Sequence, residues 1–366
     1  MSPLKIQLQA FRRRVVAGSF PQYSDLAAGL RGLRFVQADP IRSPARAQDL
    51  MLRHRVDAYV SGDLEETYPQ LDAEEGYLFA YGFMQPKVWQ DLHTKPPVGK
   101  LKALERQVLA FVKKHGEVHP RALAESFGSR SVTNYWGGQS QATKRVLEDL
   151  HDEGHLRISR RQKGVRIYAA AEHSRPKEAN PEARYARLAM TTAQVFGPTT
   201  KSFLLSELKS LTHLVPKRKE REGIVDQLVA SGQLAEVEVD GLRYLLQPDH
   251  WQSDAVPDRV RILAPFDPLV RNRQRFEQLW GWSYRFEAYV PASKRERGYY
   301  AMPLLWREKV IGWANAKVVD ERLQVEIGYV SEPTSSLKFR RALEAEIEAM
   351  TNFLGLQSGV WALNFR

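Results

Sequence analysis

The clearest alternation of apolar and polar positions runs from Lys102 to Ala170. Apolar residues recur at helical spacing up to Gly116, a second such stretch opens at Pro120, and a third covers 141–153, with Gly154 where a C-capping glycine belongs. Two short stretches of period two follow, joined by a basic turn, and they are Leu156–Ile158 and Val165–Tyr168. Three helices followed by a basic hairpin predict a winged helix.

Two further regions show related orders of elements. Residues 181–248 repeat three helical stretches, a stop at Gly232 and a hairpin across Asp240-Gly241, a strong turn signal. Near the N-terminus, helical patterns at 4–16 and 24–30 precede an extended segment and a helix after Pro44. Residues 61–100 are acidic and rich in aromatic side chains, which predicts a packed connector and not a flexible linker.

From Val260 onward the pattern changes to closely spaced strands, with a final amphipathic helix at 338–353. The predicted strands begin at Val260, Tyr284, Tyr299, Val310 and Leu323. Their density predicts a small β-barrel or a strongly curved sheet. We therefore expect an α+β chain of three tandem winged helix-turn-helix units and a C-terminal β-barrel-like domain, with boundaries at 1–100, 101–175, 176–255 and 256–366.

Charge is concentrated in two parts of the chain of 366 residues, whose net charge is +11. Residues 1–60 hold ten Lys/Arg against four Asp/Glu, and residues 101–170 hold thirteen against seven. A basic surface that served only solubility would be spread evenly over the chain. Two localised basic blocks favour binding to a nucleic acid instead. The absence of cysteine excludes disulfides, thiolate zinc sites and iron–sulfur clusters. No apolar run reaches the ~18 residues of a membrane span and no signal peptide is evident, so we expect a cytoplasmic protein of the bacterial cytosol or nucleoid.

Candidate DNA contacts come from three places in the pattern. The start of the third helix of the second unit is the part of a winged helix that usually reaches the groove, and the tip of the wing is basic. Arginines also follow the extended segment of the first unit. The candidates are Gln139, Lys144 and Arg145 on the helix, Arg160, Arg161 and Lys163 on the wing, and Arg42, Arg46 and Arg53 in the first unit.

The candidate chemistry lies at Gln37 and Asp39. Asp39 precedes Pro40, which keeps it out of the helical region, so the segment is extended and both polar side chains point to one side. An Asp-Pro pair is also a common turn initiator, and chemistry alone does not decide between the two roles. The histidines offer no metal site, since Gly154 interrupts the stretch from His151 to His155, and we expect no metal and no cofactor.

The segment Phe35-Val36-Gln37-Ala38-Asp39-Pro40-Ile41, with the basic helix that follows it, resembles the catalytic region of the AlkZ/AlkX-type winged-helix DNA glycosylases. The resemblance extends over 264–273, 284–291 and 298–303, and Gln37-Ala38-Asp39 is similar to the Gln-x-Asp motif of the AlkX branch. Many relatives place a His-Glu pair where this chain has Tyr81-Gly82. The resemblance implies that Gln37 and Asp39 are catalytic and that N-alkylated purines, including interstrand crosslinks, are released from double-stranded DNA.

Two functions follow as hypotheses. The first is a monofunctional DNA glycosylase, because an alkylated purine is a cationic leaving group, and catalysis then needs mainly a positioned water and negative charge near the sugar. The alternative is a non-enzymatic winged-helix DNA-binding protein or transcriptional regulator. Regulators usually dimerise to read two half-sites, and the sequence contains no heptad pattern, so we expect a monomer that wraps DNA.

Overall fold

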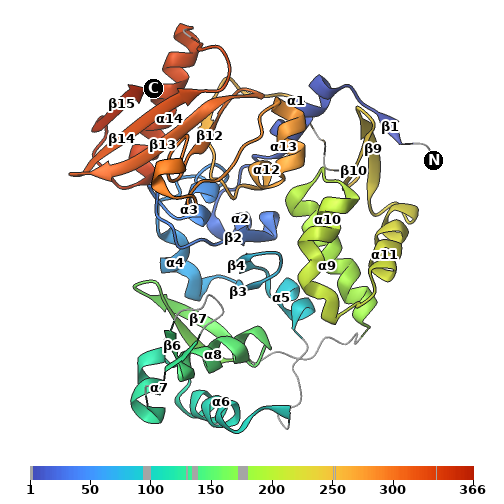
Figure 1. The fold of residues 1–366 in the computed structure, drawn as a ribbon, viewed down its shortest axis with the longest axis vertical. Coiled ribbons are helices and arrows are strands. Elements are labelled where there is room, and N and C mark those ends of the chain that lie inside the picture. Colours follow the sequence, from blue (N-terminus) through green and yellow to red (C-terminus); the bar gives the residue numbers. More distant parts are fainter. Residues whose placement is uncertain are drawn as a thin grey trace.

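The computed structural model describes residues 3–93, 100–128, 131–133, 139–171, 180–249, 251, 253–334 and 336–366. Strand β2 (Phe35–Gln37) lies near the middle of the molecule, between the C-terminal sheet, the second helical unit and the third (Figure 1). Elements distant in sequence therefore surround the segment that carries Gln37.

The region around β2 forms a small mixed layer of helices and strands. Asp25 begins α2 (Leu26–Leu33) by accepting a hydrogen bond from the amide of Ala28, as an N-cap should. The strand order is β2-β4-β3. The remaining elements are α3 (Ala47–Leu52), α4 (Asp63–Thr67), η1 (Tyr68–Gln70), β3 (Glu74–Tyr77), β4 (Tyr81–Met84) and α5 (Pro86–Leu92).

The first helix, α1 (Leu8–Gly18), packs away from α2 and α3. Its buried Phe11 belongs to a hydrophobic cluster with Phe276 of the C-terminal segment. The short strand β1 (Leu4–Lys5) pairs in parallel with β9 (Ala235–Val239) of the third unit. The sequence predicted α1 as the first helix of a winged unit with α2 and α3, and the structure does not confirm that arrangement.

The second and third units have the predicted order of helices and hairpin. At the Asp240-Gly241 turn both φ values are positive, 48° and 78°, as a tight two-residue hairpin requires. The second unit consists of α6 (Ala103–His115), α7 (Pro120–Phe127), β5 (Ser131–Thr133), β6 (Gln139–Gln141), α8 (Ala142–Asp152), β7 (Leu156–Gln162) and β8 (Val165–Ala170). The third consists of α9 (Pro181–Phe196), α10 (Lys201–Glu207), η3 (Leu208–His213), α11 (Arg218–Ala230), β9 and β10 (Leu242–Leu246).

The C-terminal segment is a five-stranded sheet of order β11-β12-β13-β14-β15, and its described strands do not close into a barrel, one of the two forms that the sequence predicted. Residues 284–290 form no strand, and β15 returns in parallel beside β14 as an edge that the sequence analysis missed. Helix α14 covers one face of this sheet (Figure 1). The apolar side chains of that face pack against the helix, whereas in a barrel they would pack against one another. The elements are β11 (Val260–Ile262), α12 (Pro268–Arg271), α13 (Arg273–Trp280), η4 (Ala292–Lys294), β12 (Met302–Trp306), β13 (Lys309–Val319), β14 (Arg322–Tyr329), α14 (Leu337–Phe353) and β15 (Trp361–Phe365).

Among the described helices, none combines the length and apolar character needed to cross a bilayer.

Candidate active site

The backbone around Gln37 is fixed by strand β4. Gln37 pairs with Gly82, and the amide of Ala38 donates to the carbonyl oxygen of Tyr81 at 2.9 Å. A Cβ atom at Gly82 would lie 2.5 Å from the carbonyl oxygen of Val36, so only glycine fits this approach of the two strands. The Tyr81-Gly82 pair, where relatives were expected to carry His-Glu, therefore shapes the strand next to Gln37.

The side-chain amide of Gln37 is held in one orientation. Its Oε1 atom accepts a hydrogen bond from Arg271 at 2.9 Å, and the residue is buried. A guanidinium group only donates, so the atom facing Arg271 must be the amide oxygen. The Nε2 group is left as a donor on the other side of the amide.

Arg271 is itself fixed by groups from two other parts of the chain. Its Nε and a terminal nitrogen donate to Oε2 of Glu207 at 2.9 and 2.8 Å, and its guanidinium lies over the ring of Phe79 at 5.2 Å. Glu207 ends α10 and Arg271 ends α12. The third unit and the C-terminal segment therefore meet at Gln37. In the sequence, Arg271 stands out only as part of the stretch 264–273 and Glu207 does not stand out, because their pairing depends on the tertiary fold.

Asp39 lies just beyond the strand and is half-buried. Its Oδ1 atom accepts from the amide of Ile41 at 2.9 Å, and its own amide donates to Oε1 of Gln48 at 3.3 Å. Burial raises the pKa of the Asp39 carboxyl above its ordinary value, and the Ile41 hydrogen bond offsets part of that rise. The charge of Asp39 in turn contributes to the raised pKa of Tyr300 in the C-terminal segment. Gln37 thus contacts the C-terminal segment directly, and Asp39 acts on Tyr300 of that segment through its charge.

Several predicted DNA contacts lie at the surface. Arg42, Lys144 and Lys163 are exposed, and the tip of the second-unit wing approaches the first unit, since a Cβ at Gly164 would lie 2.9 Å from a guanidinium nitrogen of Arg46. Three other arginines are engaged in ion pairs, which are Arg46 with Glu65, Arg145 with Asp149 and Arg160 with Glu117. Gln139 lies in β6, and its side chain is outside what the structure describes.

Two predicted DNA contacts face inward. The Arg53 side chain is only 4% exposed and pairs with Glu346 of α14. The Arg161 side chain is 11% exposed and pairs with the fully buried Glu75 at 2.6 Å. Moving either guanidinium group to a phosphate would leave a buried carboxylate unpaired, which is costly. Neither acidic partner is near in sequence, so the sequence pattern did not reveal the pairing.

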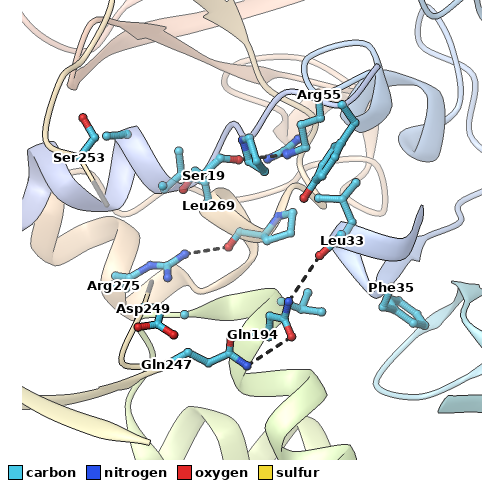
Figure 2. Close-up of a pocket in the computed structure, with 18 residues that line it drawn as sticks. Ser19, Leu33, Phe35, Arg55, Gln194, Gln247, Asp249, Ser253, Leu269 and Arg275 are labelled. Atoms are coloured by element: carbon cyan, nitrogen blue, oxygen red, sulfur yellow. Dashed lines mark hydrogen bonds between the residues drawn. The ribbon is translucent and has the colours of Figure 1, made fainter. Parts of the chain in front are cut away.

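A pocket of about 440 Å³ lies beside this region, between α2, α9 and α12 (Figure 2). Gln247 donates to Gln194 at 3.3 Å across it, and Arg275 donates to the carbonyl oxygen of Pro268 at 2.8 Å. Neither Gln37 nor Asp39 lines it. Within the described residues, no group of three or more His, Cys, Asp or Glu side chains is placed to hold a metal ion.

The class of protein follows from a family comparison. The chain belongs to the AlkZ-like DNA glycosylase family, whose model, described as DNA glycosylase AlkZ-like, matches residues 30–353. It is therefore a DNA glycosylase, a DNA-binding repair enzyme, and the match includes both Gln37 and Asp39.

Among solved structures, the fold is similar to that of Streptomyces sahachiroi DNA glycosylase AlkZ. The TM-score is 0.66 at 15% sequence identity, and the alignment covers 99% of this chain and 100% of that chain. At this identity the likeness concerns the fold. The mixed α+β architecture is thus shared over the whole length of both chains.

Proposed function

We propose that the protein hydrolyses the N-glycosidic bond of N-alkylated purines in double-stranded DNA, including purines in interstrand crosslinks. The observation that carries the proposal is the fixed orientation of Gln37 beside the half-buried carboxyl of Asp39. The Gln37-Ala38-Asp39 sequence also favours the Gln-x-Asp branch of the family. Gln37 and Asp39 are the catalytic residues of this proposal.

Alkylation at N7 or N3 gives the purine a positive charge, so the base departs without being protonated. The remaining difficulty is the oxocarbenium-like sugar and the water that must attack its anomeric carbon. The Asp39 carboxylate stabilises the positive charge on the sugar and accepts a proton from the water. Because the reaction needs no amine nucleophile, we infer a monofunctional enzyme without lyase activity.

The orientation of Gln37 specifies how the water is held. Since Oε1 is occupied by Arg271, the Nε2 group donates to the water oxygen. The hydrogens of that water remain free to point toward Asp39. The two residues thus act on different atoms of the same water, and the amide leaves a lone pair available for attack.

DNA reaches this position along a basic surface made of Arg42, Lys144 and Lys163. Arg42 follows Asp39 in the same loop, and Lys163 lies at the tip of the wing that approaches Arg46. We infer a monomer that contacts the duplex through several units, because phosphate contacts at separate points fix its register.

The proposal is tested with duplexes carrying one N7-methylguanine or one nitrogen-mustard interstrand crosslink, and with the undamaged duplex as control. We expect release of the lesion base and separation of the crosslinked strands, with strand breaks that appear only after alkaline treatment. Failure to release a base from either lesion contradicts the proposed substrate class. Strand breaks before alkali contradict monofunctional chemistry.

We expect Arg271→Lys to lower the single-turnover rate of base release by up to about 10²-fold, because lysine can pair with Glu207 but does not offer the planar fork that also orients Gln37. Rates measured at saturating protein do not depend on DNA affinity. The affinity of the variant for DNA, measured separately, should be unchanged. Arg243→Lys at an exposed position is the matched control. An unchanged rate in Arg271→Lys would show that the amide orientation is unimportant.

Replacing Lys144 and Lys163 together by alanine is expected to weaken DNA binding equally for damaged and undamaged duplexes. Each lost phosphate contact should reduce the slope of log affinity against log salt by about 1. Fluorescence anisotropy over a salt series measures both quantities. Lys309→Ala, at an exposed position beginning β13, is the control, and an unchanged slope in the double variant would place DNA elsewhere.

A further inference from the structure

A second cavity, of about 390 Å³, lies on the C-terminal sheet. Ser43, which follows Asp39 in the same loop, lines it together with Tyr299 and Tyr300. The hydroxyl of Ser43 donates to the carbonyl oxygen of Ala316 at 3.4 Å, which ties the loop to β13. The loop that carries the proposed catalytic base therefore also supplies part of the cavity wall, and the volume of the cavity is within the usual range for small-molecule sites.

The floor of the cavity is a polar row across three strands. Asn315 of β13 is the register partner of Glu326 of β14, which is the partner of Asn364 of β15. The neighbouring positions Ala316 and Val325 point to the other face, where they belong to the same hydrophobic cluster as residues of α14. One face of this sheet thus builds the core, and the other presents amides and a carboxylate.

Two groups of the row have unused hydrogen-bonding capacity. The Nδ2 atom of Asn315 donates to the carbonyl oxygen of Arg297 at 2.6 Å and to Glu326 at 3.3 Å, which leaves its Oδ1 as an acceptor. Glu326 makes no ion pair among the described residues. Lys317 also lines the cavity, but it is exposed, and water and salt screen its charge.

Tyr300 gives an independent indication of a ligand. The residue is 1% exposed, yet its hydroxyl has no hydrogen-bond partner within the described part of the chain. A buried hydroxyl without a partner costs free energy, and such groups persist where a ligand or a reaction uses them. Tyr300 lines the cavity together with Ser43, which belongs to the same loop as Asp39. A buried polar group without a partner thus lies in the wall that the Asp39 loop helps to form.

We propose that this cavity binds the alkylated purine while Asp39 acts on its sugar, an inference that rests on the proposed function. The ligand is a planar, positively charged heterocycle. The Glu326 carboxylate and the tyrosine rings favour such a cation, and the amides of the row offer hydrogen bonds to the edge of the base. A normal purine has no positive charge and gains less from the same groups, so the cavity selects the lesion.

The test separates binding from hydrolysis by using duplexes with a 2′-fluoro sugar, which resists loss of the base. The probes are two such duplexes, one with N7-methylguanine and one with guanine at the same position. We expect the protein to prefer the methylated duplex, and Glu326→Gln to reduce that preference by roughly tenfold, as for a lost charge-assisted contact. Glu332→Gln makes the same charge change at an exposed position outside the cavity and should leave the preference unchanged.

Tyr300→Phe is the second variant. It removes a hydroxyl that has no partner in the described chain, so the variant should fold at least as well as the original protein. We expect it to lose part of the preference for the methylated duplex and to release N7-methylguanine more slowly from an ordinary sugar. Wild-type preference and rate in both variants, from a protein that does release the base, would overturn the cavity proposal. Absence of base release by the unaltered protein would instead overturn the proposed function.

Discussion

Asp39→Asn is expected to lower the single-turnover rate of N7-methylguanine release by about 10²–10⁴-fold, which is the usual contribution of a positioned general base. Asparagine keeps the size of the side chain and can still accept the hydrogen bond from the Ile41 amide. It removes the negative charge that faces the sugar and the ability to take a proton. Quantifying released base at saturating protein, together with DNA affinity, measures the chemical step and binding separately.

The pH dependence provides the control for this variant. Burial raises the pKa of Asp39, so its carboxylate forms only at a pH above the ordinary value of about 4. The rate of the unaltered protein should rise with pH through that raised pKa, and the residual rate of Asp39→Asn should not. Because a raised pKa in the folded state favours the protonated form, ionised Asp39 opposes folding at neutral pH, and the variant should melt at the same or a higher temperature. A variant with full activity would exclude Asp39 as the base.

Asp267→Ala is expected to lower the free energy of unfolding by about 3–5 kcal/mol, the usual cost of leaving a buried charge without its partner. Asp267 accepts two hydrogen bonds from Arg55, at 2.8 and 3.1 Å. It also accepts one from the amide of Leu269 at 3.0 Å and so caps the N-terminus of α12. The Arg55 side chain is 3% exposed and the Asp267 side chain is 0% exposed. Urea unfolding followed by circular dichroism should show a lower midpoint.

The matched control is Glu220→Ala, which breaks the exposed pair of Lys217 and Glu220. Surface pairs contribute about 0–1 kcal/mol, so its urea midpoint should barely change. Equal midpoints for the two alanine variants would contradict the view that the Arg55–Asp267 pair stabilises the junction between the first unit and the C-terminal segment. Since α12 also carries Arg271, loss of Asp267 should reduce base release as well.

Local patterns predicted the elements whose signals are short in range. The helices and hairpin of the second unit and the Asp240-Gly241 turn follow from spacing, glycine stops and turn chemistry, and they are present in the structure. The strands of the C-terminal segment were predicted less well. Residues 284–290 alternate as a strand would but form none, because alternation does not reveal whether a partner strand is available. Strand β15 depends on parallel pairing with β14, a contact made only after α14 has crossed the sheet.

The candidate site also combines features that local sequence predicts with features that depend on contacts between distant parts of the chain. The extended segment with Gln37 and Asp39 follows from the proline at position 40 and from the family resemblance. The group that orients Gln37 does not, because Glu207, Arg271 and Gln37 come from three separated regions. The predicted DNA contacts differ in the same way in their surroundings. Charge along a sequence does not distinguish Lys163, which is exposed, from Arg53, whose acidic partner lies in α14.

The pairing of β1 with β9 has a consequence for synthesis on the ribosome. Leu4 emerges early, but its strand partner Val237 is made much later, and α1 needs the still later Phe276. At roughly 5–20 residues per second, the first segment stays unpaired for on the order of ten seconds or more. The residue that orients Gln37 is made in the same late interval. A nascent chain on the ribosome is therefore expected to lack base-releasing activity until its last third has emerged.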